Sequence, residues 1–112
     1  MTPLSLPTLV DETLARARQA TNGRAAHTLV GGHDRVLRQT LLALTAGTGL
    51  AEHGSPGEAT LQVLRGRVRL RSGGDEWAGA AGDFLLIPPA RHALDCDEDA
   101  VVVLTVAADG AA

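Results

Sequence analysis

The chain has 112 residues, enough for one domain with a single core, and its 13 glycines indicate frequent turns. A net charge of −3 and an aromatic content of 2% argue against a nucleic-acid or membrane-surface partner. The lone cysteine, Cys96, excludes an intramolecular disulfide, and no apolar stretch has the length of a membrane span, so we expect a cytoplasmic protein.

Residues 1–25 predict an arm followed by one short helix. Two prolines favour an extended arm over residues 1–7. Thr8 then stands where a capping hydroxyl is expected, with acidic residues close behind it. Apolar residues recur at helical spacing, at Val10, Leu14 and Ala17. This narrow apolar stripe predicts a helix that packs on the outside of the domain or on a partner subunit.

Residues 26–112 predict one all-β domain. Short apolar runs broken by Gly, Pro and Asp recur about every ten residues, which is typical of an antiparallel sandwich or barrel. The expected strands span 26–30, 35–45, 48–53, 59–64, 67–72, 75–78, 83–87, 91–95 and 100–107. Turns are expected at 31–32, 73–74 and 82–83, and the acidic residues at 95–99 are interpreted as an exposed turn before the last strand.

Strand 67–72 alternates arginines on one face with apolar residues on the other. Arg67, Arg69 and Arg71 could bind a phosphate or carboxylate. A solvated outer face is the favoured interpretation, because Asp75 and Glu76 lie just across the next turn.

Three segments, 41–44, 84–87 and 101–104, are apolar at every position. In an antiparallel sheet this pattern indicates strands covered on both faces. The helix can cover one of them. A second copy of the chain is the expected cover for the rest, so the sequence predicts a homodimer.

Two sets of residues have distinctive spacings: Gly47, His53 and Gly66, then Gly82, Pro88 and His92. Over residues 35–107 these spacings resemble the two motifs of the cupin superfamily, although Ala90 stands where the second motif has glycine and one residue is missing before its histidine. The resemblance implies an antiparallel cupin-type jelly-roll barrel, here preceded by the short N-terminal helix.

In cupins that bind metal, histidines and a glutamate from these motifs converge on one ion inside the barrel. Here Ser55 stands at the second histidine position and Ala59 at the glutamate position. His53 and His92 remain as candidate ligands of a divalent transition metal ion. Two imidazoles bind such an ion weakly, because stable sites use three or four protein ligands.

A third ligand could come from Glu58, if Pro56 and Gly57 shift the strand by one residue. Asp95 and His33 are more distant candidates. Without metal, the two histidines would line a polar pocket or hydrogen-bond to the backbone. Cys96 stands between acidic residues, which are expected to raise the pKa of its thiol, so we do not expect an activated nucleophile.

Three functions follow from these residues. The favoured one is a small cupin that binds a small organic ligand in the barrel, as a sensor or carrier. Its expected pocket is lined by His53, Ser55, Ala59, Leu61, Val63 and His92. The alternative is a metal-dependent enzyme, such as a dioxygenase or isomerase, with His53 and His92 as ligands. A structural or interaction module is the third, and the sequence leaves the presence of enzymatic activity open.

Overall fold

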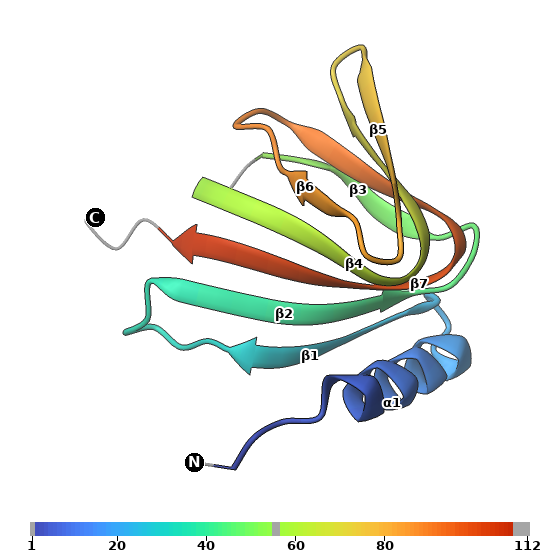
Figure 1. Ribbon diagram of the computed structural model, residues 1–112. Coiled ribbons are helices and arrows are strands. Elements are labelled where there is room, and N and C mark those ends of the chain that lie inside the picture. Colours follow the sequence, from blue (N-terminus) through green and yellow to red (C-terminus); the bar gives the residue numbers. More distant parts are fainter. Residues whose placement is uncertain (1, 55–56, 109–112) are drawn as a thin grey trace.

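The computed structural model describes residues 2–54 and 57–108, in which one helix and seven strands form a curved antiparallel barrel (Figure 1). The elements are α1 (Leu6–Gln19), β1 (Arg24–Val30), β2 (Leu37–Leu44), β3 (Gly49–His53), β4 (Gly57–Ser72), β5 (Asp75–Ala80), β6 (Phe84–Leu86) and β7 (His92–Ala108). The predicted all-β class with one N-terminal helix is confirmed. The three glycine turns lie, as predicted, between β1 and β2, β4 and β5, and β5 and β6.

Two long strands, β4 and β7, belong to both layers of the barrel. The second half of β7 lies between β2 and the first half of β4, and β1 and β6 extend this layer. The first half of β7 lies between β3 and the second half of β4, and β5 extends that layer. The pairing of β4 with β7 shifts register between Val63 and Val68, where both strands bend from one layer into the other.

Because β4 and β7 continue through these bends, four of the predicted strands form only two in the structure. Segments 59–64 and 67–72 form one strand that passes through Gly66, whose φ of 79° is favourable only for glycine. A side chain there would also collide with the backbone of Asp99. Segments 91–95 and 100–107 likewise form one strand, so the turn predicted at 95–99 is wrong. The acidic residues remain in the sheet because β4 places arginines opposite them, with Arg67 paired to Glu98 and Arg69 to Asp95.

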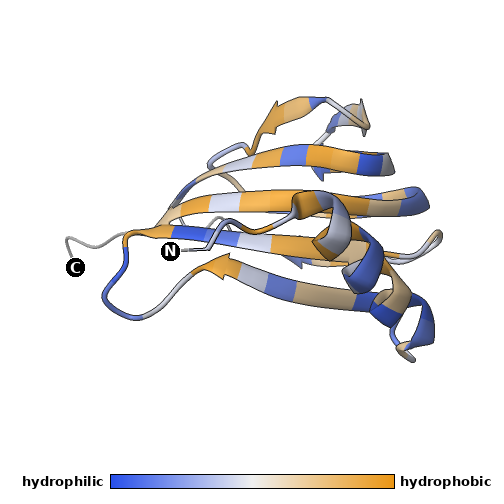
Figure 2. Ribbon diagram, turned by 60° about the horizontal axis from the view of Figure 1, so that its bottom comes forward, coloured by the Kyte–Doolittle hydropathy of each residue, from blue (hydrophilic) through white to orange (hydrophobic). Residues whose placement is uncertain are grey.

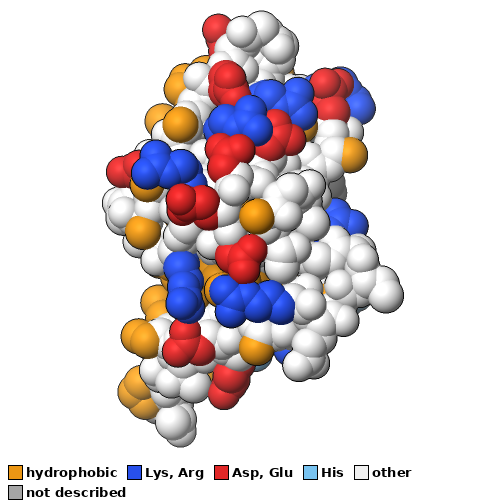
Figure 3. All heavy atoms as spheres, turned by 90° about the vertical axis from the view of Figure 1, so that its right-hand side faces the viewer, with side chains coloured by type: hydrophobic (Ala, Val, Ile, Leu, Met, Phe, Trp, Pro, Cys, Tyr) orange, Lys and Arg blue, Asp and Glu red, His pale blue; other side chains and the backbone are white. Residues whose placement is uncertain are grey.

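Two of the three arginines on one face of β4, Arg69 and Arg71, pair with acids of the neighbouring strands, and Figure 3 shows basic and acidic side chains side by side on this side of the molecule. Arg69 contacts Asp97 of β7 at 2.9 Å and Glu76 of β5 at 2.8 Å, and Arg71 contacts Asp95 of β7. The hydrogen bonds that the two arginines donate to these carboxylates raise the pKa of both guanidinium groups, and Arg71 lowers the pKa of Asp95. Because Arg69 and Arg71 already have partners, the solvated-face interpretation is supported over an anion site.

The first core fills the space between the two layers. It contains buried residues from β2, β4 and β7, together with inward-facing residues of β3 and the β6 segment. Its fully buried members are Leu44, Val63, Val68, Ala100 and Val102. Alternate positions of β2 and β7 point the other way, so these strands have a second apolar face outside the barrel.

Helix α1 covers that outer face (Figure 2). Val10, Leu14 and Ala17 pack with residues of β2 and β7 in a second core, so the predicted stripe is confirmed and lies on the sheet of its own chain. The helix begins earlier than predicted. Ser5, not Thr8, is its N-cap, and Pro7 occupies the first turn, where a missing N–H costs nothing.

The third apolar run, residues 84–87, is covered on its outer face neither by the helix nor by any other described residue. Leu85 packs into the barrel core, while Phe84 and Leu86 of β6 point outward and are 60% and 76% exposed. The described part of the chain contains no helix with the length and apolar character needed to cross a lipid bilayer.

Candidate functional site

The two motif histidines meet where β3 ends and β7 begins, a place that we call the barrel mouth. His53 and His92 are opposite each other in the pairing of these strands, and their ring centroids are 4.5 Å apart at an interplanar angle of 61°. The strands approach closely because β3 begins with Gly49, where a side chain would collide with the carbonyl of Leu94. The central geometric prediction from the motifs, that these imidazoles converge, is confirmed.

Both rings are held in the same way by the backbone. Nδ1 of His53 lies 2.8 Å from the carbonyl oxygen of Ala51, and Nδ1 of His92 lies 3.0 Å from that of Ala90. A carbonyl only accepts hydrogen bonds, so each Nδ1 carries the proton. In the neutral form of each ring, the Nε2 atom is then an acceptor, able to bind a hydrogen-bond donor or a metal ion.

The two histidines differ in exposure. His53 is exposed at the end of β3, while only 5% of His92 reaches solvent. No buried side-chain nitrogen or oxygen in the described residues lacks a hydrogen-bond partner.

The cavity next to the histidines is small and aliphatic. Its volume is about 30 Å³, room for about one water molecule. Its wall consists of Leu42, Leu50, His53, Leu61, Leu70, Ile87, His92, Leu94 and Leu104. A sequence can indicate which strand positions face inward, but it cannot indicate how completely their side chains fill the space. Leu61 and the two histidines, which are among the residues predicted to line a barrel pocket, belong to this wall.

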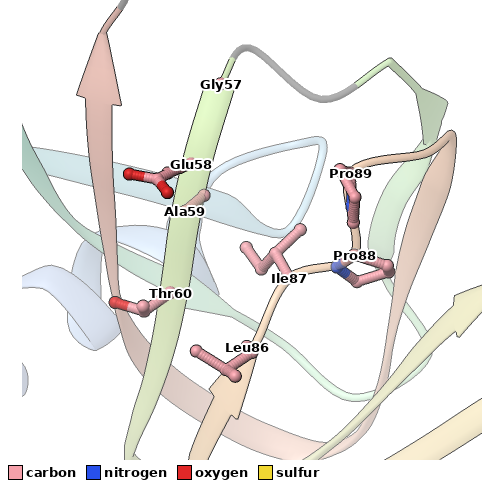
Figure 4. A pocket seen from close by; sticks show the side chains of 8 residues that line it. All are labelled: Gly57, Glu58, Ala59, Thr60, Leu86, Ile87, Pro88 and Pro89. Carbon is pink, nitrogen blue, oxygen red and sulfur yellow. The ribbon is translucent and has the colours of Figure 1, made fainter.

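A larger hollow lies beside this cavity, between the start of β4 and the segment that follows β6 (Figure 4). This open groove has a volume of about 720 Å³. Its wall is made by residues 57–60 and 86–89. Ile87 lines both the groove and the aliphatic cavity, and its side chain lies across the gap toward β4.

The other predicted site residues lie in different places. Ala59 is buried in the groove wall, and Val63 is buried in the barrel core outside the cavity wall. Glu58 is exposed on the opposite face of β4 from Ala59, because neighbouring strand residues point to opposite faces. Ser55 lies outside the described residues.

The donor set does not match a cupin metal centre. Across residues 2–54 and 57–108, no group of three His, Cys, Asp or Glu side chains could hold an ion together. The methyl group of Ala59 replaces a carboxylate, and Glu58 does not join the histidines. Two neutral imidazoles would leave most coordination positions of a transition metal to water.

The nearby charged side chains pair with each other, and the thiol of Cys96 is buried. Arg91 and Glu52, which flank the two histidines in sequence, form an exposed ion pair at 3.0 Å. Burial, followed by the charges of Asp99 and Asp97, raises the pKa of the Cys96 thiol to about 11. The expectation that Cys96 is not an activated nucleophile is supported, with burial as the larger cause.

Solved structures with the same architecture place this site in context. A cupin superfamily protein from Desulfitobacterium hafniense superposes with a TM-score of 0.77 over 96% of this chain and 92% of that chain, at 16% identity. The chain has the cupin fold. A conserved protein of unknown function from Streptococcus pyogenes is 27% identical, with a TM-score of 0.71 over 80% of this cupin-fold chain and 77% of that protein.

An enzyme also shares the fold. Salicylate 1,2-dioxygenase from Pseudaminobacter salicylatoxidans matches 89% of this chain with a TM-score of 0.75 and 20% identity. The match covers 33% of the dioxygenase, so the chain corresponds to about a third of that protein. No protein-family model matches the chain, and no curated protein sequence does. The predicted resemblance to cupins is thus confirmed in the fold.

Proposed function

We propose that the chain binds a small organic molecule at the barrel mouth, through Nε2 of His53 and His92. The observation that carries this proposal is the matched anchoring of the two rings, which leaves two acceptor nitrogens beside an otherwise aliphatic wall. Convergent polar groups in an apolar hollow are the usual form of a small-molecule site.

The chemistry of the mouth restricts the ligand. Because both Nδ1 atoms donate to carbonyls, a ligand of the neutral rings must donate a hydrogen bond to Nε2, as an alcohol or a phenol does. A carboxylic acid is ionised at neutral pH, so its carboxylate would bind with one imidazole that has taken up a proton from solvent at Nε2. The rest of the ligand would be aliphatic, to match the leucines of the wall.

Nitrogen-15 NMR of the histidine rings tests the proposal, with cyclohexanol and cyclohexanecarboxylic acid as probes. We expect the Nε2 resonances of His53 and His92 to shift during titration. The chain provides its own controls, because His27 in β1 and His33 beyond it are absent from the wall of this cavity. Equal shifts at all four histidines, or none at the mouth, would contradict the proposal.

A metal-dependent activity is the second candidate, and one observation favours it. Histidines that bind metals commonly donate their other ring N–H to a carbonyl, as both histidines do here. The chain's own contribution would be to hold both Nε2 atoms deprotonated and oriented.

Metal content separates the two candidates. The wild type, purified without a histidine tag after growth with Fe, Mn, Zn, Ni and Cu, would be compared with His53→Ala, His92→Ala and His33→Ala. Stoichiometric metal that is lost in the first two variants and kept in His33→Ala supports the metal-dependent function. Metal-free wild type rejects it and leaves the organic ligand.

A further inference from the structure

We infer that Ile87 is the divider between the open groove and the aliphatic cavity, and that the ligand site of this chain is the single pocket formed when its side chain swings aside. This inference rests on the proposed function and adds the position, shape and access route of the site. It concerns two hollows of very different size, about 720 Å³ and about 30 Å³, that share one residue.

The closed cavity alone is too small for an organic ligand. Its volume holds about one water molecule, whereas pockets for small molecules commonly span several hundred Å³. The groove has that volume, but its wall contains no histidine. Only the two spaces together provide both the room and the imidazole acceptors, so a ligand that reaches the histidines from the groove must pass Ile87.

The surroundings of Ile87 allow its side chain to move while its backbone stays in place. Its N–H donates to the carbonyl of Ala59 at 3.0 Å, which ties this segment to β4. Pro88 and Pro89 follow directly and restrict the backbone further. Opposite the side chain lies Ala59, whose methyl group leaves more space than the glutamate found at this motif position in metal-binding cupins.

The joined pocket carries its two imidazoles at one end only. The cavity end is otherwise aliphatic, and the groove end combines Leu86, Pro88 and Pro89 on one side with Glu58 and Thr60 of β4 on the other. We therefore assign to the site an elongated aliphatic or alicyclic molecule with one hydroxyl or carboxyl group. That group would bind between the histidines, and the hydrocarbon part would lie along the groove.

Xenon exchange tests the role of Ile87 as a divider independently of the histidines. Xenon enters apolar cavities, and ¹²⁹Xe NMR measures its exchange rate. Ile87→Ala and Leu42→Ala both remove aliphatic volume from the cavity wall, but only Ile87 also faces the groove. We expect xenon to exchange at least tenfold faster in Ile87→Ala than in Leu42→Ala. Equal rates would overturn the inference.

The organic probes then test whether Ile87 controls the entry of a ligand. We expect cyclohexanol to associate fastest with Ile87→Ala, more slowly with Ile87→Val and slowest with the wild type. Leu37→Ala, an exposed position outside both walls, should stay near wild type. Histidine-dependent binding with the same association rate in every protein would overturn the divider and leave the proposed function intact. If the alanine variants do not fold, Ile87→Val and Leu42→Val give the same comparison.

Discussion

Three apolar runs that look alike in the sequence have different surroundings in the fold. Residues 41–44 and 101–104 lie side by side in β2 and β7, with the barrel core on one face and α1 on the other. Residues 84–87 have the barrel core on one face only, and Phe84 and Leu86 are exposed on the other. A fully apolar run therefore indicates a strand with two apolar faces, but not what covers the second one.

The largest expected effect comes from the covered face. Leu14 is 1% exposed between α1 and the sheet, and Leu14→Ala is expected to lower the free energy of unfolding by about 2–5 kcal/mol, because it leaves a cavity there. Urea denaturation would measure the loss. Leu6→Ala, in the exposed first turn of the same helix, is the matched control and should cost much less. Similar losses in both variants would show that the helix does not bury its stripe as described.

The exposed face of β6 provides the second test. The homodimer stays a prediction until this test is carried out. If a second copy covers β6, replacing Phe84 and Leu86 with serine should weaken dimerisation by about tenfold or more, because apolar area is lost on both copies. Analytical ultracentrifugation would follow the change from dimer to monomer. The control is Val36→Ser with Leu37→Ser, at another exposed edge. A wild type that is monomeric at high micromolar concentration would reject this dimer.

A smaller effect is expected where the covering helix is anchored to the sheet. Asp99 accepts hydrogen bonds from the Ala46 N–H at 2.9 Å and from Arg18 at 2.8 Å, and both lower the pKa of its carboxyl group. A lowered pKa stabilises the fold above the unfolded value of about 4, and this contribution is lost as the pH falls through the folded value.

Asp99→Asn should therefore cost about 0.5–1 kcal/mol at pH 7, since the pair with Arg18 is partly exposed. The difference from wild type should shrink below about pH 4, where the wild-type carboxylate is itself protonated. Thermal unfolding from pH 7 to pH 2.5 would measure it, with the exposed Asp34→Asn as control. A difference that stays constant over this range would contradict the assigned pKa direction.

The last test concerns the barrel interior and needs no substitution. Cys96 is 4% exposed and its thiol has a raised pKa of about 11, so very little thiolate is present at pH 8 and a disulfide reagent reaches it poorly. We expect native protein to react far more slowly than protein unfolded in guanidinium chloride. Fast labelling of the native state would show that the core opens more readily than the covered faces suggest.

Much of this molecule could be predicted from local patterns. The helical stripe, the glycine turns and the inward alternation of the strands all depend on residues close in sequence. The convergence of His53 and His92 could also be expected, because the resemblance to the two cupin motifs implies it. Ser5 followed by Pro7 is a local helix-start signal that was available in the sequence and was missed.

What escaped prediction depends on distant residues. The acidic residues of β7 have the composition of a turn and stay in a strand only because arginines of β4 lie beside them. Gly66 resembles a turn residue, although it serves a bend within one long strand. The size of the cavity depends on how leucines from four strands pack together, and no local pattern contains that information.

The position of β7 has a consequence for the order in which the chain acquires its structure. Strands β2, β3 and β4 each pair with β7, yet all three are synthesised before it. While the ribosome is still making the first ninety or so residues, their ladders have no central partner, and long-range pairings of this kind form slowly. The nascent chain therefore exposes apolar surface of these strands until β7 emerges, and such exposure favours aggregation over folding.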